Sequence, residues 1–265
     1  MSLKPLVKWS GGKGDEIPLF SKWIPETFET YVEPFAGAAA LYFHLNRYNK
    51  PNVINDVHTE LTDFYRSMKD GKANDIVSFM NEHPNDEETY YTVRDHTEIK
   101  EPLDNAKRFY YLRKTCYRGM LRYSKNGKFN IPYGRYKTCN YEALTDPRYT
   151  ELLKNTEILH GSFEECFKRY NNPDTFCFLD PPYDSEFTDY GYCQFGKEHH
   201  AKLAECFKNT QMKCLMVIGD TPMIRELYNG YIVDEYHKKY RFKLHSGRIN
   251  DKINTTHLVI TNFTT

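Results

Sequence analysis

The sequence predicts an α/β fold in which a mostly parallel sheet carries helices on both faces and an inserted block separates its two halves. Short apolar runs typical of buried strands recur along the 265-residue chain, at residues 31–33, 51–55, 157–160, 176–179, 214–218, 231–236 and 257–261. Segments with helical spacing of apolar residues lie between most of them. Strands that alternate with helices favour a parallel sheet covered on both faces.

The first part of the chain contains two strand–helix units. Residues 31–33 form the first expected strand, residues 34–38 a turn and residues 39–46 a helix. The second strand ends at Asp56, and the helix expected after it carries apolar side chains at helical spacing: Leu61, Phe64, Tyr65 and Met68.

The middle of the chain differs from the two ends. Residues 71–114 have an amphipathic helical pattern, and residues 117–136 contain the Asn126-Gly127 pair that favours a β-hairpin. Strands return after residue 156, with helices expected at residues 197–209 and 222–229. We therefore expect two domains, one formed by residues 1–60 and 156–265 and an inserted one formed by residues 61–155.

The composition is that of a globular protein, with 40% hydrophobic and 27% charged residues. We find no apolar run of about 18 residues and no signal-like segment, which predicts no membrane association and an intracellular protein, cytoplasmic or within a host cell if the source is viral. The seven cysteines include no C-x-x-C pair. Reduced thiols and no metal site are therefore expected.

The net charge is zero, but the charges are unevenly distributed. Residues 106–141 contain ten Lys or Arg residues, nine aromatic residues and no Asp or Glu. A basic stretch interleaved with aromatic residues is typical of nucleic-acid binding. The alternative is an ordinary solvated charged face.

The most informative motif is Asp180-Pro181-Pro182-Tyr183, which follows the apolar residues 176–179. It therefore lies at the carboxyl end of a strand, where open α/β sheets bind ligands. The prolines supply no N–H and leave carbonyl groups available. The Asp180 carboxylate and the Pro181 carbonyl can accept the two protons of an exocyclic NH₂, while Tyr183 stacks on a planar base. The alternative is a Pro-rich turn that ends a strand.

Two further segments fit a small-molecule cofactor. Residues 33–39 form a turn rich in Gly and Ala between a strand and a helix, and Asp56 follows Gly37 by the spacing of a ribose-binding acid. Simple helix–strand packing explains this pattern equally well. Near the amino end, Trp9 can shelter a sulfonium group and Lys13 can pair with a carboxylate. Gly14 follows Lys13 where a phosphate-binding loop needs Ser or Thr, which excludes that motif.

Together these motifs resemble those of the Dam-type, or α-group, DNA adenine-N6 methyltransferases. The matching elements occur in family order: Lys8-Trp9-x-Gly11-Gly12-Lys13, Glu33-Pro34-Phe35-x-Gly37, Asn55-Asp56, Tyr117-x-Gly119-x-x-Arg122-Tyr123, Gly127-x-Phe129-Asn130-x-Pro132-x-Gly134 and Asp180-Pro181-Pro182-Tyr183. The resemblance implies a Rossmann-like S-adenosylmethionine-dependent methyltransferase sheet with an inserted helical and β-hairpin target-recognition domain. It also implies methyl transfer from S-adenosylmethionine to adenine N6 in a short double-stranded palindrome.

The resemblance assigns residues to three roles. The catalytic residues would be Asp180, Pro181, Pro182 and Tyr183. The residues that bind S-adenosylmethionine would be Trp9, Lys13, Phe35, Gly37, Asp56, Phe163 and Asp180. The residues that face the DNA would be Lys8, Tyr117, Arg118, Met120, Arg122 and Pro132.

The recognition sequence is a separate expectation. Arg122 matches the family, and arginine commonly reads guanine, so GATC is the first expectation. Arg118 and Met120 replace the Asn and Leu found in the best-known bacterial members, so the broader expectation is a short palindrome that contains guanine. A cognate restriction endonuclease as partner and a monomer or weak dimer on DNA are further expectations.

Three alternatives remain open at this stage. A cytosine-N4 DNA methyltransferase uses the same amino-group chemistry, although it typically has Ser at the position of Asp180. An RNA or protein methyltransferase is the second alternative, and a catalytically inactive DNA-binding protein is the third. His199 and His200 are adjacent, so on a helix they point to different faces, and surface or loop packing is expected rather than metal binding.

Overall fold

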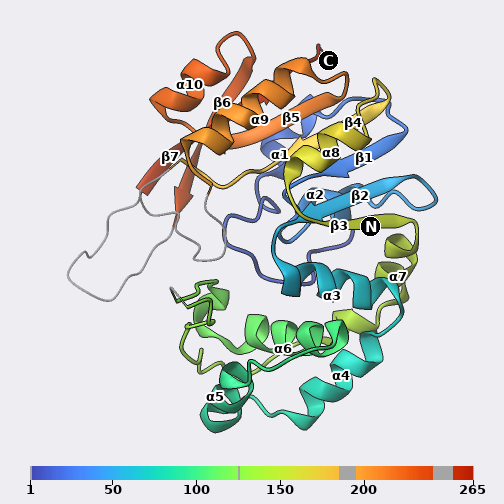
Figure 1. Cartoon of the computed structure of the whole chain (residues 1–265), viewed down its shortest axis with the longest axis vertical. Helices are drawn as coiled ribbons and strands as arrows, with labels where there is room; N and C mark the ends of the chain where they lie inside the picture. The colour runs from blue at the N-terminus through green and yellow to red at the C-terminus, as the bar shows by residue number, and fades with distance from the viewer. Residues whose placement is uncertain (1, 125, 185–194, 241–252, 265) are drawn as a thin grey trace.

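The computed structural model describes residues 2–124, 126–184, 195–240 and 253–264. Among them the chain forms a seven-stranded sheet with helices on both faces (Figure 1), which confirms the predicted α/β class. The strands are β1 (Thr30–Glu33), β2 (Asn52–Asp56), β3 (Thr156–His160), β4 (Thr175–Leu179), β5 (Lys213–Gly219), β6 (Ile232–Tyr240) and β7 (Ile253–Thr261). The helices are α1 (Ile17–Phe20), α2 (Ala40–Leu45), α3 (Thr59–Lys69), α4 (Ala73–Glu82), α5 (Glu87–Asp95), α6 (Pro102–Thr115), α7 (Pro147–Lys154), α8 (Phe163–Arg169), α9 (Lys197–Asn209) and α10 (Pro222–Leu227), with 3₁₀ turns η1 (Ser21–Trp23), η2 (Tyr117–Gly119) and η3 (Glu142–Thr145).

The strand order is β3-β2-β1-β4-β5-β7-β6. Strands β1 to β5 pair in parallel, whereas β7 pairs antiparallel with both β5 and β6. Parallel neighbours need crossover connections, and the helices between β1 and β5 provide them. From β1 the chain moves outward to β2 and β3, and then returns to place β4 on the other side of β1. The neighbours β1 and β4 therefore form a topological switch point.

The central strands β4 and β5 bury side chains on both faces of the sheet, as their unbroken hydrophobic runs predict. Along β4, successive side chains alternate between the two faces. Phe178 packs on one face, where its ring stacks on Phe20 of α1 with 5.4 Å between centroids. Leu179 belongs to the other face, in a cluster that includes Leu203 of α9 and Ile224 of α10. The carboxyl end of β4 is therefore held rigidly between two packed layers of side chains.

Several helices begin where the local sequence supplies a cap. The Thr221 hydroxyl accepts the Ile224 N–H at 3.3 Å, and Pro222 takes the first position of α10. Asp146 caps α7 in the same manner by accepting the Arg148 N–H at 3.1 Å. No helix was predicted over α7, although the Asp146-Pro147 pair carries this signal.

The predicted helical block after β2 consists of α4, α5 and α6, which form the lower part of the molecule (Figure 1). Helix α3 lies between this block and the sheet. Its Lys69 Nζ donates to the Thr156 carbonyl of β3 at 2.8 Å, and its Phe64 ring stacks on Tyr110 of α6. The division into residues 1–60 with 156–265 and residues 61–155 stays a prediction. Among the described residues, no helix is long and apolar enough to cross a membrane.

The predicted hairpin is a chain reversal held by single bridging pairs rather than by a regular ladder. Cys116 bridges Tyr133 and Tyr123 bridges Phe129, both in antiparallel fashion. The Ser124 N–H donates to the Lys128 carbonyl at 2.8 Å and closes the turn. Residue 125, which belongs to this turn, lies outside the described residues.

Candidate functional site

A cavity of about 450 Å³ lies at the carboxyl ends of β1 to β4. Its wall contains one residue at or just beyond the end of each strand: Glu33, Asp56, His160 and Asp180. This edge includes the switch point between β1 and β4, where open α/β sheets bind ligands. Every residue predicted to bind the cofactor or the target base lines this cavity: Trp9, Lys13, Phe35, Gly37, Asp56, Phe163, Asp180, Pro181, Pro182 and Tyr183.

The turn after β1 places backbone N–H groups and Asp56 side by side. The Gly37 N–H donates to Asp56 Oδ2 at 2.9 Å, and the His58 N–H donates to Oδ1 of the same carboxylate at 2.9 Å. Burial raises the pKa of Asp56, and these backbone bonds oppose the rise. A carboxylate can accept about four hydrogen bonds, so Asp56 can still accept a hydroxyl from a ligand.

Residue 37 must be glycine because the Trp9 indole lies against its backbone. Its φ is +46°, a conformation that side chains disfavour, and a Cβ there would lie 2.6 Å from the Trp9 indole. The Tyr65 hydroxyl donates to the Gly37 carbonyl at 2.8 Å and holds the turn in place. The indole of Trp9 therefore lies directly over the turn that follows β1.

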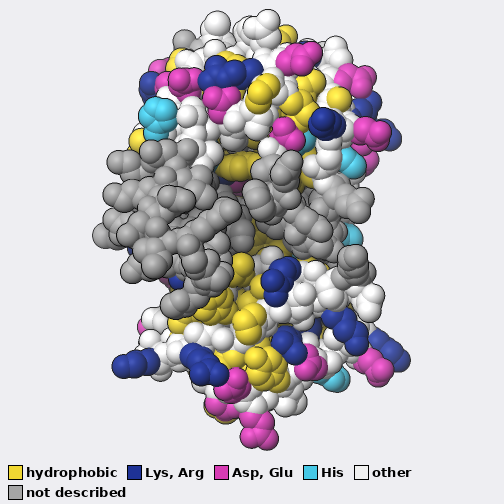
Figure 2. Space-filling view, turned by 90° about the vertical axis from the view of Figure 1, so that its left-hand side faces the viewer, with side chains coloured by type: hydrophobic (Ala, Val, Ile, Leu, Met, Phe, Trp, Pro, Cys, Tyr) yellow, Lys and Arg dark blue, Asp and Glu magenta, His cyan; other side chains and the backbone are white. Residues whose placement is uncertain are grey.

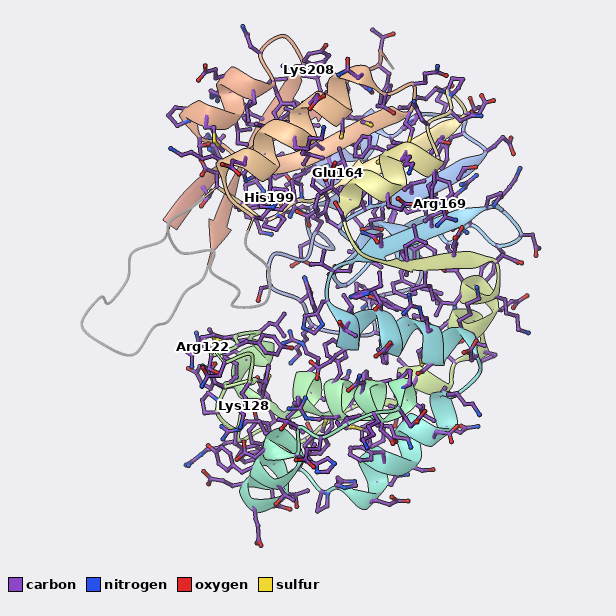
Figure 3. The ribbon with its side chains drawn as sticks, in the orientation of Figure 1. Arg122, Lys128, Glu164, Arg169, His199 and Lys208 are labelled. Atoms are coloured by element: carbon purple, nitrogen blue, oxygen red, sulfur yellow. The ribbon has the colours of Figure 1, made fainter. Side chains whose placement is uncertain are left out.

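An aromatic cluster forms another wall of the cavity. The rings of Phe35 and Phe163 lie 5.4 Å apart, and Phe195 contacts both of them. His199, at the start of α9, lies against Phe195 and also lines the cavity (Figure 3). Flat apolar rings around an open space suit a planar heterocycle such as adenine. The sequence assigned Phe35 and Phe163 to this wall but did not place Phe195 or His199 there.

Lys13 and Asp180 form a buried ion pair in this cavity. Lys13 Nζ lies 2.5 Å from Asp180 Oδ1 and also donates to the Gly11 carbonyl at 2.9 Å. The Lys13 side chain is 1% exposed, whereas that of Asp180 is 20% exposed. Burial raises the pKa of Asp180, although the Lys13 charge opposes the rise. The carboxylate is thus held in place and remains accessible from the cavity.

Glu33, at the end of β1, is a second carboxyl group in the cavity wall. It is buried, and the Tyr31 hydroxyl donates to its Oε2 at 2.9 Å. Burial raises the pKa of Glu33 to about 8, and the negative charge of Asp180 adds to the rise. Glu33 is therefore mostly protonated at neutral pH. The sequence included it in the turn motif without assigning it a role.

Tyr183 rests on a network of buried polar groups. Its ring packs edge-on against His257 of β7, and its hydroxyl lies 3.5 Å from His257 Nε2. His257 Nδ1 lies 2.6 Å from Glu16 Oε2, and Tyr236 and Lys238 of β6 also donate to the Glu16 carboxylate. Glu16 lies far from Tyr183 in sequence, and no local motif indicated this network.

The residues predicted to face DNA lie outside the cavity and gather near one another. Arg118 extends over the Tyr117 ring, and the Tyr117 N–H donates to the Pro132 carbonyl at 2.8 Å. Lys8 Nζ lies over the ring of Tyr136, which follows Pro132. Lys8, Arg118, Met120, Arg122 and Pro132 are exposed, and Tyr117 is half-buried. In Figure 3, Arg122 lies at the left of the lower half of the molecule, and His199 lies left of centre in the upper half.

Only some of the basic side chains in residues 106–141 lie on the surface. Arg122, Lys128, Arg135 and Lys137 are exposed, and Figure 2 shows Lys and Arg side chains among hydrophobic ones on the lower half of this face. Arg108 and Arg113, by contrast, are buried and bind main-chain carbonyls. The interpretation of the whole stretch as an electrostatic footprint is therefore wrong for these two residues, whose side chains are bound inside the protein.

The adjacent residues His199 and His200 lie in different surroundings. His199 faces the cavity, whereas His200 is buried against Phe195, with 4.8 Å between ring centroids. Burial lowers the pKa of His200, and neither ring nitrogen has a hydrogen-bond partner among the described residues. Of the two kinds of packing expected, His200 shows packing against a loop residue and not a surface position, and the expected separation of the two histidines onto different faces is confirmed.

Comparisons with known proteins identify the family of this chain. The family model described as "D12 class N6 adenine-specific DNA methyltransferase" matches residues 9–244. The chain is 58% identical to the Type II methyltransferase M.CviBI of Paramecium bursaria Chlorella virus NC1A, over 98% of this chain and 100% of that protein. It is 32% identical to the Type II methyltransferase M.MjaIII of Methanocaldococcus jannaschii, over 91% of this chain and 89% of that protein. It is 29% identical to the DNA adenine methylase of Haemophilus influenzae, over 86% and 83% respectively.

These matches favour the adenine-N6 enzyme over the three alternatives that the sequence left open. The family description names both the atom that is methylated and the polymer that carries it. The matched residues include the cavity, the basic stretch and most of the sheet, so the likeness is not confined to one motif. The chain therefore belongs to the D12 class of N6 adenine-specific DNA methyltransferases.

Proposed function

We propose that this chain transfers a methyl group from S-adenosylmethionine to N6 of an adenine that has been flipped out of a short DNA palindrome. The observation that carries the proposal is one cavity, at the switch point of the sheet, that joins Asp180-Pro181-Pro182-Tyr183 to the turn after β1. An adenine cannot present N6 to this cavity while it is stacked in the duplex, so it must leave the helix.

The residues present fit S-adenosylmethionine. A cavity of about 450 Å³ lies in the range that holds small-molecule cofactors. Phe35 and Phe163 would hold the adenine ring, Asp56 would accept the ribose hydroxyls, and Gly37 would allow close approach of the backbone. Trp9, Lys13 and Asp180 would hold the methionine end. When bound, the cofactor supplies a methyl group that is already activated on a sulfonium.

Asp180, Pro181 and Tyr183 would receive the target base. Lys13 occupies Oδ1 of Asp180, which leaves Oδ2 to accept one N6 proton. The Pro181 carbonyl would accept the other N6 proton, and Pro182 keeps that carbonyl in place because its ring restricts the backbone. Two such bonds favour a more tetrahedral N6 with an available lone pair. Tyr183, held by His257, would stack on the ring and offset the few kcal/mol that flipping costs.

Lys8, Tyr117, Arg118, Met120, Arg122 and Pro132 would face the DNA. Arg122 is the residue that we expect to read guanine, because its guanidinium is exposed and already oriented. The Arg122 Nε donates to Asn130 Oδ1 at 2.7 Å. We propose GATC as the first sequence to test, with residues 61–155 as the target-recognition domain.

Two further properties follow as proposals from the relatives. M.CviBI and M.MjaIII are both named Type II methyltransferases, a class that accompanies restriction endonucleases, so we propose a cognate endonuclease that cuts the same sequence. A palindrome offers one adenine to the enzyme on each strand. We therefore propose action as a monomer, or as a weak dimer on DNA.

The test is methyl transfer from labelled S-adenosylmethionine to a GATC duplex and to a panel of other short palindromes, with the product nucleosides identified. N6-methyladenine on GATC alone would support the whole proposal, and N6-methyladenine on another palindrome would replace the sequence only. Asp180→Ala serves as the active-site control, with Asp174→Ala, at an exposed turn, as its match. Normal turnover by Asp180→Ala would sink the assigned mechanism.

A further inference from the structure

Arg113 of α6 is buried between two segments that the proposed function assigns to different ligands. Residues 8–13, the cofactor loop, carry Trp9 and Lys13. Residues 117–122, the DNA-reading segment, carry Tyr117 and Arg122. The guanidinium of Arg113 lies over the Trp9 ring, 5.6 Å from its centroid, and contacts the main chain of both segments.

The contacts are hydrogen bonds to three carbonyl oxygens. Nε donates to the Lys8 carbonyl at 3.1 Å, and Nη2 donates to the same oxygen and to the Gly119 carbonyl. Nη1 donates to the Met120 carbonyl at 2.6 Å. The guanidinium is planar and its N–H directions are fixed, so the three carbonyls hold fixed positions relative to one another.

Burial makes this arrangement costly to break. The Arg113 residue is 1% exposed, and a buried cation requires its hydrogen bonds because water cannot replace them. A movement of the Gly119 and Met120 carbonyls would therefore either draw the Lys8 carbonyl with it or leave the guanidinium incompletely bonded. Since Trp9 follows Lys8 directly, such a movement would reach the cofactor cavity.

Direct packing reinforces the link. Gly119 has φ +61°, and a Cβ there would lie 3.0 Å from the side chain of Lys8. The absence of a side chain at residue 119 thus lets the two segments touch. On the DNA side, the Tyr117 N–H binds the Pro132 carbonyl, which ties the hairpin to the same unit.

A second connection runs from the other wall of the cavity. His58 donates its backbone N–H to Asp56, and its Nε2 lies 2.6 Å from the Tyr123 hydroxyl. Tyr123 follows Arg122 and donates to Glu60 of α3 at 2.8 Å. The rings of His58 and Tyr123 therefore connect the two proposed sites. His58 binds Asp56, the acid proposed to bind the ribose, and Tyr123 directly follows Arg122, the residue proposed to read guanine.

We propose that Arg113 is a positioning residue that couples sequence recognition to the seating of the methyl donor. The proposal rests on the proposed function, because it takes the cofactor from the cavity and the DNA from the exposed segment. Recognition of the correct sequence orders residues 117–122, and Arg113 transmits that order to Lys8 and Trp9. Coupling of this kind is reciprocal, so the cofactor must tighten binding of the correct DNA by the same factor.

The test uses Arg113→Lys, which keeps the charge and removes the planar fork. Arg47→Lys is the matched control, because Arg47 also donates to two carbonyls, those of Phe28 and Glu29. These residues directly precede β1, at the end of the strand opposite to the cavity. Dissociation constants for S-adenosylhomocysteine are measured by calorimetry alone, with the duplex that the wild type methylates, and with a duplex changed at one base pair. Thermal melting of each variant reports folding.

We expect the correct duplex to tighten cofactor binding by about fivefold or more in the wild type and in Arg47→Lys. Arg113→Lys should reduce this factor to about one and weaken discrimination between the two duplexes by roughly tenfold. If Arg113→Lys does not fold, Gly119→Ala provides the same test from the other side of the contact. Wild-type coupling that persists in the folded variant, or no coupling in the wild type, would overturn the proposal. Failure of the proposed function would be distinct, since the wild type would then bind no cofactor or methylate no adenine.

Discussion

Lys13 Nζ lies 2.5 Å from Oδ1 of Asp180, so the loop that precedes the first strand is ion-paired to the residue that follows the fourth. The pair joins two motifs that lie 167 residues apart in the chain. It is nearly buried on the lysine side and open to the cavity on the aspartate side. One lysine can thus hold the carboxylate in position and oppose the rise in its pKa that burial causes.

The first prediction concerns removal of that lysine. In Lys13→Met, burial acts on Asp180 without an opposing charge, so the pKa of Asp180 rises further and the carboxylate is protonated up to a higher pH. We expect kcat to fall roughly 100-fold and the acid limb of its pH profile to move to higher pH. Lys22→Met, which removes an exposed pair with Asp234, should change neither. An unmoved acid limb would mean that turnover does not need ionised Asp180.

The second prediction isolates the contact between Gly37 and Trp9. Gly37→Ala places a methyl group 2.6 Å from the indole, in addition to the strain of a positive φ. Gly71→Ala carries the strain alone, since its φ is +73° and no atom lies within 4 Å of the added methyl. We expect Gly37→Ala to lose about 1–3 kcal/mol more stability than Gly71→Ala and to bind cofactor at least roughly tenfold more weakly. Equal losses in urea unfolding and calorimetry would contradict this account.

The third prediction concerns the pH dependence that Glu33 creates. Burial raises its pKa from 4.5 to about 8, so its contribution to stability is fully present below about pH 4.5 and is lost as the pH rises toward 8. Between pH 5 and 8 the free energy of unfolding of the wild type should decline relative to Glu33→Gln by up to about 1.4 kcal/mol per pH unit. Urea unfolding across this range measures the difference, and parallel curves would show that Glu33 does not titrate in the folded protein.

The fourth prediction has the opposite sign and concerns Glu16. Burial alone would raise its pKa, but His257, Lys13, Lys238 and Tyr236 outweigh burial and lower the pKa to about 2. The contribution of Glu16 to stability is therefore present above pH 4.5 and is lost as the pH falls toward 2.

Glu16→Ala should lose about 3 kcal/mol of stability near pH 7, because its buried partners remain without their carboxylate. The loss relative to the wild type should shrink in unfolding experiments near pH 3. The control is Glu29→Ala, which removes an exposed pair with Lys50 and should change stability little. A loss that does not depend on pH would indicate a packing defect instead.

The fifth prediction separates sequence recognition from chemistry. Arg122→Lys keeps the charge but removes the fork that Asn130 orients, so discrimination at one guanine should fall by about 1–3 kcal/mol. Cofactor affinity without DNA should not change. Arg148→Lys, on the surface of α7, is the control for an arginine-to-lysine change away from the residues that are proposed to face DNA. The measurement is kcat/KM on the palindrome that the wild type methylates and on each of its single-base variants. An equal loss on all of these duplexes would mean that Arg122 contacts phosphate only.

The local sequence was sufficient to locate the seven strands and the residues that line the cavity, although β6 ends at Tyr240 and β7 begins at Ile253, beyond the predicted residues 231–236 and 257–261. The run before Asp180 is apolar at every position, and such a run is buried on both faces in any parallel sheet, so both the strand and the place of Asp180 at its end could be predicted. Gly37, Asp56, Lys13 and Trp9 are recognisable because ligand binding demands particular residue types at particular spacings. All of them line one cavity.

The tertiary structure decided the order of the last strands and the polar groups that support the cavity. Nothing local to β7 indicates that it lies between β5 and β6, because its pairing partners are chosen by packing across the sheet. The burial of Arg113 within a basic stretch, and the pairing of Glu16 with His257, depend on segments that are distant in the chain. The sequence by itself thus determined the fold class, the positions of the strands and the residues that line the cavity, because these follow from short-range patterns of polarity and residue type. Only the tertiary structure determined which charges are buried and which partners hold them, because the free energy of a buried charge is set by neighbours that the fold brings together.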